Sequence, residues 1–167
     1  MTFTAGTRLT AYDLNDYYHR AAYAPAPAQI NQQTTIFDAG GLSVDVAPNK
    51  RYALDGYLAY ESSTTGDIRF VLDAPATATG HWGLHGLHTG SSSPGSLEAY
   101  RLDAFGDANG FSIGSNAAGT VVGAWVVGYL FAGSAGGRVT VRFTQGTFDG
   151  ANTIVRAGSW LRATPLD

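Results

Sequence analysis

The feature that most limits how this chain can fold is an apolar run between Gly119 and Gly133, with the sequence GTVVGAWVVGYLFAG. A membrane-spanning helix needs about 20 consecutive apolar residues. This run is shorter, and glycines interrupt it. Its β-branched and aromatic residues, with glycine at both ends, are instead typical of a strand buried on both faces. The run therefore predicts a strand in the core of a β-sandwich.

The segment that follows the run alternates between apolar and polar residues. Val139, Val141 and Phe143 are separated by arginine and threonine, which is the period of a strand with one buried face. Only the short segment 134–137, with the sequence SAGG, separates this strand from the apolar run. We therefore predict that the two strands form a hairpin.

Other segments show the same pattern of strands and turns. Residues 51–60 place tyrosine and leucine on one face, and residues 68–72 alternate after a short turn, so we predict a second hairpin there. Residues 42–46, 97–105 and 153–163 also have strand character. About eight to ten strands separated by turns predict an all-β fold, a jelly-roll-like β-sandwich.

The N-terminal part is the only segment for which we expect a helix. Thr10 is a suitable N-cap, and Leu9 and Leu14 have the spacing of a hydrophobic staple around it. Prolines follow Tyr23, so the helix should end near that residue. The expected organisation is an N-terminal anchoring arm and helix (1–23), a linker (24–33) and a β-sandwich domain (34–167).

Charge is scarce in this sequence, because only 14% of its 167 residues are charged and the net charge is −3. So little charge is typical of a chain whose surface is partly covered by partners, or of one whose exterior is rich in serine, threonine and glycine. The chain has no basic cluster, which argues against nucleic acid as a partner. It also has no cysteine, which excludes disulfides and thiolate metal sites. Its first residues lack a signal-peptide pattern, and we expect no membrane partner and no cofactor.

Three histidines, His81, His85 and His88, are the strongest candidates for metal ligands. On a helix their spacing would align the imidazoles, but Gly83 and Gly86 argue against a helix, and no acidic residue lies beside them to orient the rings. We therefore interpret them as loop histidines that pack beside a tryptophan, and keep metal binding as the alternative.

Other chemical motifs are weaker. Residues 110–114 match the G-x-S-x-G pattern of hydrolases, but that chemistry needs a strand-to-helix turn, and the residues that follow predict a turn alone. No spacing brings two carboxylates together, so we expect no catalytic residues and no enzyme. Trp125 and Trp160 lie in apolar strands and are expected in the core. Trp82 lies in a long glycine-rich segment, 74–96, which makes it the candidate for surface ligand contact.

The first residues carry a family resemblance. Segment 3–15, FTAGTRLTAYDLN, resembles the start of small virion proteins of tailed phages that infect actinobacteria. Segments 50–60, 67–70 and 74–82 are similar to successive parts of their β-domain. The resemblance implies a non-enzymatic minor tail, head-fibre or capsid decoration protein on the virion head or tail surface. It would attach through its arm to other virion proteins, such as major capsid or tail proteins. The anchoring residues expected in this arm are Phe3, Leu9, Leu14, Tyr17 and Tyr18.

Segment 157–161, AGSWL, is similar to the closing strand of the same virion proteins. It is also similar to the last strand of trimeric jelly rolls of the tumour-necrosis-factor and complement-head type, which lies near the three-fold axis. This similarity implies a homotrimer, and trimerisation would explain the low charge because it covers apolar surface. The alternative function is a glycan- or receptor-binding adhesin that contacts the host cell envelope through Trp82.

Overall fold

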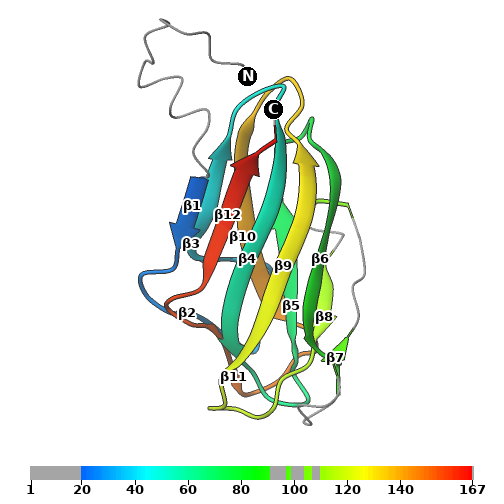
Figure 1. The fold of residues 1–167 in the computed structure, drawn as a ribbon. Coiled ribbons are helices and arrows are strands. Elements are labelled where there is room, and N and C mark those ends of the chain that lie inside the picture. Colours follow the sequence, from blue (N-terminus) through cyan, green and yellow to red (C-terminus); the bar gives the residue numbers. More distant parts are fainter. Residues whose placement is uncertain (1–19, 91–96, 99–103, 107–109, 167) are drawn as a thin grey trace, which may run out of the picture.

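The computed structural model describes residues 20–90, 97–98, 104–106 and 110–166, and these residues form strands and no helix (Figure 1). The prediction of an all-β fold is confirmed. The strands are β1 (Arg20–Tyr23), β2 (Ala28–Asn31), β3 (Phe37–Val46), β4 (Arg51–Glu61), β5 (Ile68–Asp73), β6 (Thr79–Leu87), β7 (Leu97–Glu98), β8 (Phe111–Ile113), β9 (Val122–Phe131), β10 (Gly137–Gln145), β11 (Asn152–Val155) and β12 (Trp160–Pro165).

Two antiparallel sheets lie face to face (Figure 1). The larger sheet has the order β1-β12-β4-β9-β6-β7, and β11 joins it by pairing with both β4 and β2. The smaller sheet has the order β3-β10-β5-β8. The strands from β3 to β10 pair in a nested way: β3 with β10, β4 with β9, β5 with β8, and β6 with β7. The result is a sandwich in which neighbouring strands are distant in sequence.

Both predicted hairpins are wrong. The apolar run forms β9 in the larger sheet and the following strand is β10 in the smaller one. Likewise β4 lies in the larger sheet and β5 in the smaller one. A short loop can turn the chain from one layer to the other as well as within one layer, and the period of two identifies a strand's inner face without identifying its neighbour.

Glycines allow the tight crossing from β9 to β10. Gly133 has φ +67°, and a Cβ there would lie 2.2 Å from the carbonyl oxygen of Thr77. Gly136 has φ +60°, and its Cβ would lie 2.8 Å from the carbonyl oxygen of Val46. Both residues combine a left-handed backbone with a close approach of other backbone, which requires glycine. The glycines that suggested a hairpin turn therefore connect the two sheets.

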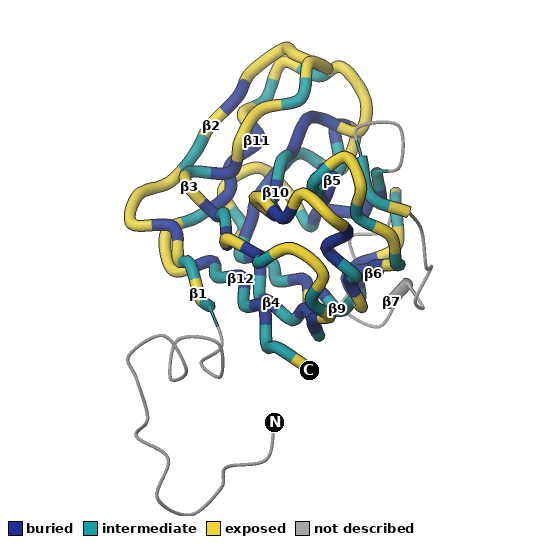
Figure 2. The backbone as a smooth tube through the Cα atoms, turned by 90° about the horizontal axis from the view of Figure 1, so that it is seen from above, coloured by how far each residue is buried: buried dark blue, intermediate teal, exposed yellow. Residues whose placement is uncertain are grey.

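The core lies between the sheets, where the buried positions of both layers face each other (Figure 2). The predicted inner faces of 51–60 and 138–145 are confirmed, because all their apolar members are buried. Aromatic rings meet edge to face within the core, as between Tyr60 and Phe70 at 5.6 Å. The confirmed inner residues are Tyr52, Leu54, Leu58, Tyr60, Val139, Val141 and Phe143.

The predicted helix is wrong at its end, because Arg20–Tyr23 form strand β1 and pair with β12. The hydrogen bonds that β12 offers at the sheet edge outweigh the weak helical spacing of these few residues. The rest of the predicted helix lies outside the described residues. The expected linker, 24–33, contains β2, which pairs with β11 and buries Ile30. Residues 20–33 therefore belong to the sandwich.

The expected irregular segment 74–96 contains a nine-residue strand, β6, which pairs with β9. Its glycines serve close packing. A Cβ on Gly86 would lie 3.2 Å from the side chain of Ile113 and 3.3 Å from that of Ala124. In the segment 97–105, the described strand is limited to Leu97–Glu98.

Candidate functional site

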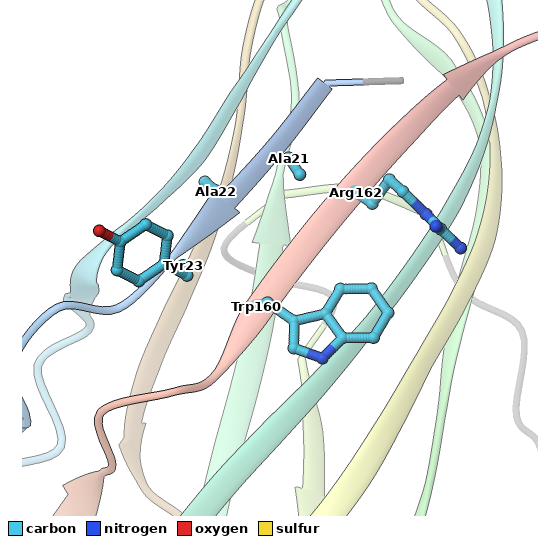
Figure 3. Close-up of a pocket in the computed structure, with 5 residues that line it drawn as sticks. All are labelled: Ala21, Ala22, Tyr23, Trp160 and Arg162. Atoms are coloured by element: carbon cyan, nitrogen blue, oxygen red, sulfur yellow. The ribbon is translucent and has the colours of Figure 1, made fainter. Parts of the chain in front are cut away.

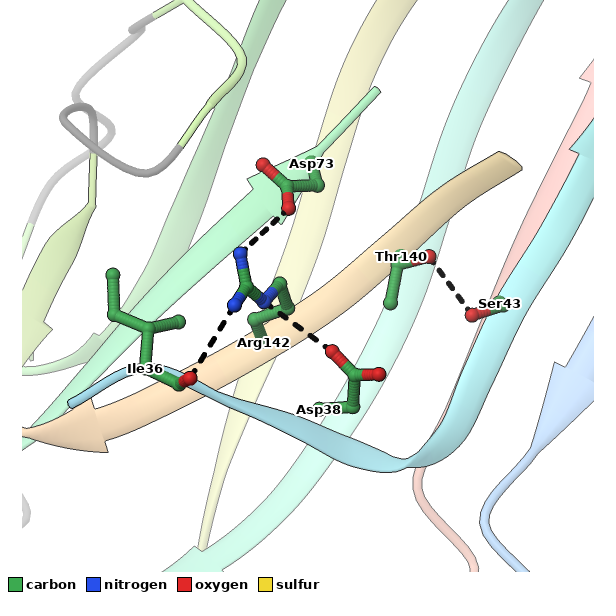
Figure 4. Close-up of polar contacts among 6 residues, drawn as sticks. All are labelled: Ile36, Asp38, Ser43, Asp73, Thr140 and Arg142. Carbon is green, nitrogen blue, oxygen red and sulfur yellow. Dashed lines mark hydrogen bonds and ion pairs between the residues drawn. The ribbon is translucent and has the colours of Figure 1, made fainter. Parts of the chain in front are cut away.

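The outer face of the smaller sheet is polar. Arg142 on β10 donates to Asp73 at 2.9 Å and to the carbonyl oxygen of Ile36 at 3.3 Å, and forms an ion pair with Asp38 (Figure 4). Other exposed outward positions of this sheet carry serine, threonine, aspartate and arginine. Such a face is well suited to water.

The outer face of the larger sheet is aromatic. Across four neighbouring strands, Tyr23 lies opposite Trp160, Trp160 opposite Tyr57, and Tyr57 opposite Trp125. We call these four residues the aromatic row. His85 on β6 continues it beyond Trp125. The side chains point away from the core, and Tyr23 is 69% exposed and Trp125 51% exposed. A row of large aromatic side chains in contact with solvent marks an interaction surface.

The rings of the aromatic row are tilted against one another. The rings of Tyr57 and Trp125 are 5.2 Å apart at 58°, and those of Trp125 and Trp160 are 6.3 Å apart at 80°. Gly123 supports this arrangement, because a Cβ there would lie 2.4 Å from the hydroxyl oxygen of Tyr57. The missing side chain lets the Tyr57 ring lie over β9. The surface is therefore uneven, with ring edges and ring faces both exposed.

An ion pair of one arginine and one aspartate lies beside the aromatic row. Arg162 on β12 donates two hydrogen bonds to Asp55 on β4, at 3.0 and 2.6 Å. This hydrogen bonding, together with the negative charge of Asp55, raises the pKa of Arg162 above its ordinary value. The guanidinium carbon also lies 5.6 Å from the ring centre of Trp160. The pair adds hydrogen-bonding groups to the surface but little net charge.

An open depression of about 260 Å³ lies at the β1 end of the aromatic row (Figure 3). The small residues Ala21 and Ala22 of β1 form part of its lining. Tyr23, Trp160 and Arg162 form the rest of its lining. A protruding apolar side chain of a partner would fit such a depression.

Trp82 is a core residue, and its interpretation as a surface ligand contact is wrong. It is 1% exposed, and its indole N–H donates to the carbonyl oxygen of Ala104 at 3.0 Å. Its ring meets Phe111 edge to face at 4.6 Å. Even-numbered residues of β6 such as Trp82 and Leu84 face the core. The adhesin alternative has therefore lost the residue that motivated it.

Trp125 and Trp160, by contrast, were expected in the core and lie on the outer face. Strand β9 is accordingly not buried on both faces as predicted, because only its even-numbered apolar residues face the core. A signal for the outward position of Trp160 was present in the sequence, whereas Trp125 has uncharged residues, Gly123 and Val127, at the equivalent spacing. Arg162 and Asp55 are charged and lie two residues from Trp160 and Tyr57, so they share their faces. That spacing places both aromatic residues on the solvent side.

His81 and His85 lie on strand β6, so their interpretation as loop residues is wrong, and His88 lies just beyond the strand. His81 and His85 share the outer face, opposite Tyr129 and Trp125 respectively. The Nδ1 atom of His88 lies 2.7 Å from the carbonyl oxygen of Thr89. Within the described residues, no group of three or more histidine, cysteine, aspartate or glutamate side chains is arranged to hold a metal ion.

Ser112, the serine of the G-x-S-x-G match, lies inside strand β8, so it is not on a strand-to-helix turn. The five expected anchoring residues lie outside the described residues: Phe3, Leu9, Leu14, Tyr17 and Tyr18.

The described part of the chain contains no helix that is long and apolar enough to cross a membrane.

No protein-family model matches the chain, and no curated protein matches it. Among solved structures, the VP2 subviral particle of infectious bursal disease virus is 13% identical over 90% of this chain and 41% of that one, with a TM-score of 0.25. A structure of the Gx strain of that virus is 14% identical over 89% of this chain and 41% of that one, with a TM-score of 0.27. The chain thus spans about two fifths of these viral proteins, and a likeness this weak carries no functional argument.

Proposed function

We propose that this protein is a non-enzymatic structural component of a phage virion, a capsid decoration, head-fibre or minor tail protein at the particle surface. It attaches to other virion proteins by its N-terminal arm and forms a homotrimer through a jelly-roll β-sandwich. The observation that carries the proposal is the exposed aromatic row on a chain with very little charge. The resemblance of residues 3–15 to phage virion proteins is the reason for placing the protein in a phage particle.

The nested strand pairing supports the jelly roll. The two four-strand sets β3-β10-β5-β8 and β4-β9-β6-β7 arise when one long antiparallel hairpin wraps into two layers. Jelly rolls contain eight strands in two sheets, and they are common in viral capsid proteins and lectins. Strands β1, β2, β11 and β12 extend the larger sheet beyond this set.

The state of the carboxylates supports a structural role. Asp38 and Asp73 pair with Arg142, and Glu61 pairs with Arg156 at 2.7 Å. Hydrolytic carboxylate pairs face each other across a substrate, whereas these carboxylates face arginine. Such pairs fix neighbouring strands and loops.

Removal of residues 1–19 tests the attachment. The cut spares β1, whose pairing with β12 supports the Tyr23 end of the aromatic row. We expect the shortened chain to fold and to keep its oligomeric state, but to be missing from purified particles. Full-length chain with the same tag is the control. Incorporation of the shortened chain at the control level would contradict the anchoring role, and absence of the control from particles would contradict the virion assignment.

Native mass spectrometry tests the homotrimer. One chain has a mass of 17.5 kDa, so a complex of three chains is expected. A single chain at micromolar concentration would contradict the proposed self-association.

A further inference from the structure

We propose that the outer face of the larger sheet, centred on the aromatic row, is the surface by which one copy of this chain binds a second copy. This inference rests on the self-association in the proposed function and deepens it by naming the face and its occupant. The face consists of the outward side chains of β1, β12, β4, β9 and β6.

The size of the face matches a stable interface. Five strands spaced about 4.8 Å apart are roughly 24 Å wide. Strands β4 and β9 have 11 and 10 residues, and at about 3.3 Å per residue they are roughly 33 Å long. The five strands range from 4 to 11 residues in length, so the face covers about 630 Å² at these spacings. This lies within the roughly 600–1,000 Å² that each partner contributes to a standard protein interface.

The charges on the two outer faces differ in a way that favours the larger sheet. On the smaller sheet, Arg138 and Asp45 are 3.4 Å apart with side chains 72% and 71% exposed, so water solvates both. On the larger sheet, Arg162 and Asp55 are held by two hydrogen bonds. A pair held by two short hydrogen bonds tolerates loss of water better than a highly exposed pair joined by a single contact of 3.4 Å does. Burial of the larger-sheet face is therefore the less costly of the two.

The tilt of the rings favours a protein partner over a sugar. A sugar stacks the C–H groups of one face of its ring on an exposed and unobstructed aromatic face. The Trp125 ring is instead tilted at 58° to the Tyr57 ring and at 80° to the Trp160 ring. An interface between copies brings the same uneven set of rings from both sides, and tilted aromatic contacts are favourable. Tryptophan, tyrosine and arginine are also the residues that dominate binding energy at protein interfaces.

The test is a matched pair of charge substitutions, Trp125→Glu and Ser112→Glu, each introducing one negative charge on an exposed strand position. Trp125 lies on the aromatic row, whereas Ser112 lies on the outer face of the smaller sheet, opposite Arg69. Sedimentation equilibrium over a range of concentrations gives the association constant. We expect Trp125→Glu to weaken association on the order of a hundredfold, and Ser112→Glu to leave it unchanged.

A second variant protects the test against a folding defect. Tyr129→Glu lies four residues further along β9 on the same face, and Tyr129 is 42% exposed. Circular dichroism and a urea melt show whether each variant is folded. Because the chain has no cysteine, a spin label on Tyr129→Cys is unique in each copy. Magnetic coupling between the labels of two neighbouring copies should then be detectable. This coupling should disappear when Trp125→Glu is added.

The outcomes separate the two proposals. If the wild type is an oligomer and the folded Trp125→Glu and Tyr129→Glu chains form the same oligomer, the assignment of this face is overturned while self-association stands. A wild-type monomer would overturn self-association itself. Loss of the oligomer in Ser112→Glu alone would move the interface to the smaller sheet, and so would also overturn the inference.

Discussion

Replacement of Trp82 by alanine distinguishes a core residue from a ligand contact. The side chain is 1% exposed and packs against Phe111. A buried tryptophan removes about 150–250 Å² from water, which at about 25 cal/mol per Å² gives an upper limit of about 4–6 kcal/mol. Substitutions of this kind in cores cost about 3–5 kcal/mol. We therefore expect a loss of about 4 kcal/mol, and a melting temperature about 8–16 °C lower for a chain of this length.

The assay is urea unfolding followed by circular dichroism, at one protein concentration because the proposed self-association would contribute to apparent stability. Phe148→Ala is the matched control, since Phe148 is 62% exposed and its loss should change stability by less than about 0.5 kcal/mol. Trp82→Phe keeps an aromatic ring but loses the hydrogen bond to Ala104, so we expect a loss of about 1–2 kcal/mol. Wild-type stability in Trp82→Ala would refute the burial argument, and any loss of adsorption would then report ligand contact.

Two further predictions concern buried hydroxyl groups. The Tyr60 hydroxyl donates to Gly114 at 2.7 Å, and burial raises its pKa well above the ordinary value. The folded state therefore keeps a proton that the unfolded state loses, so this stabilisation is complete below about pH 10 and declines above it by up to about 1.4 kcal/mol per pH unit. Tyr60→Phe should reduce the alkaline slope of the unfolding free energy, and an unchanged slope would count against this origin. Ser115→Ala removes the hydroxyl that bonds both backbone groups of Ser62. The urea midpoint should then report a loss of about 1–3 kcal/mol, compared with less than about 1 kcal/mol for the half-buried Ser43→Ala.

The sequence was informative about strand faces and uninformative about strand partners. The period of two identified the buried side of β4 and β10 correctly, because a pleated strand places alternate residues on opposite faces. It could not identify neighbours. Strand β4 pairs with β9 and β12, which follow it by more than 60 residues. A short loop made β5 the apparent partner, whereas the fold uses that loop to change layers.

The incorrect predictions for Trp82 and Trp125 have a common physical cause. The glycines around Trp82 predict a loop, yet they allow strand β6 to lie close to its neighbours. The apolar residues around Trp125 predict a core position, yet its side chain points outward. Local composition describes the neighbours in sequence. Burial depends on which face of a strand meets the other sheet, and local composition does not identify that face.

The contrast between β9 and β10 connects the sequence pattern with the proposed association. Strand β10 has arginine and threonine at its outward positions 138–142, as expected for a face in water. Strand β9 has Trp125, Val127 and Tyr129 at its outward positions, so its sequence resembles that of a strand covered on both sides. In the single chain only one side is covered by the core. If a second copy covers the other side, the continuous apolar run reflects burial in the assembly, and β10 alternates because its outer face remains in solvent.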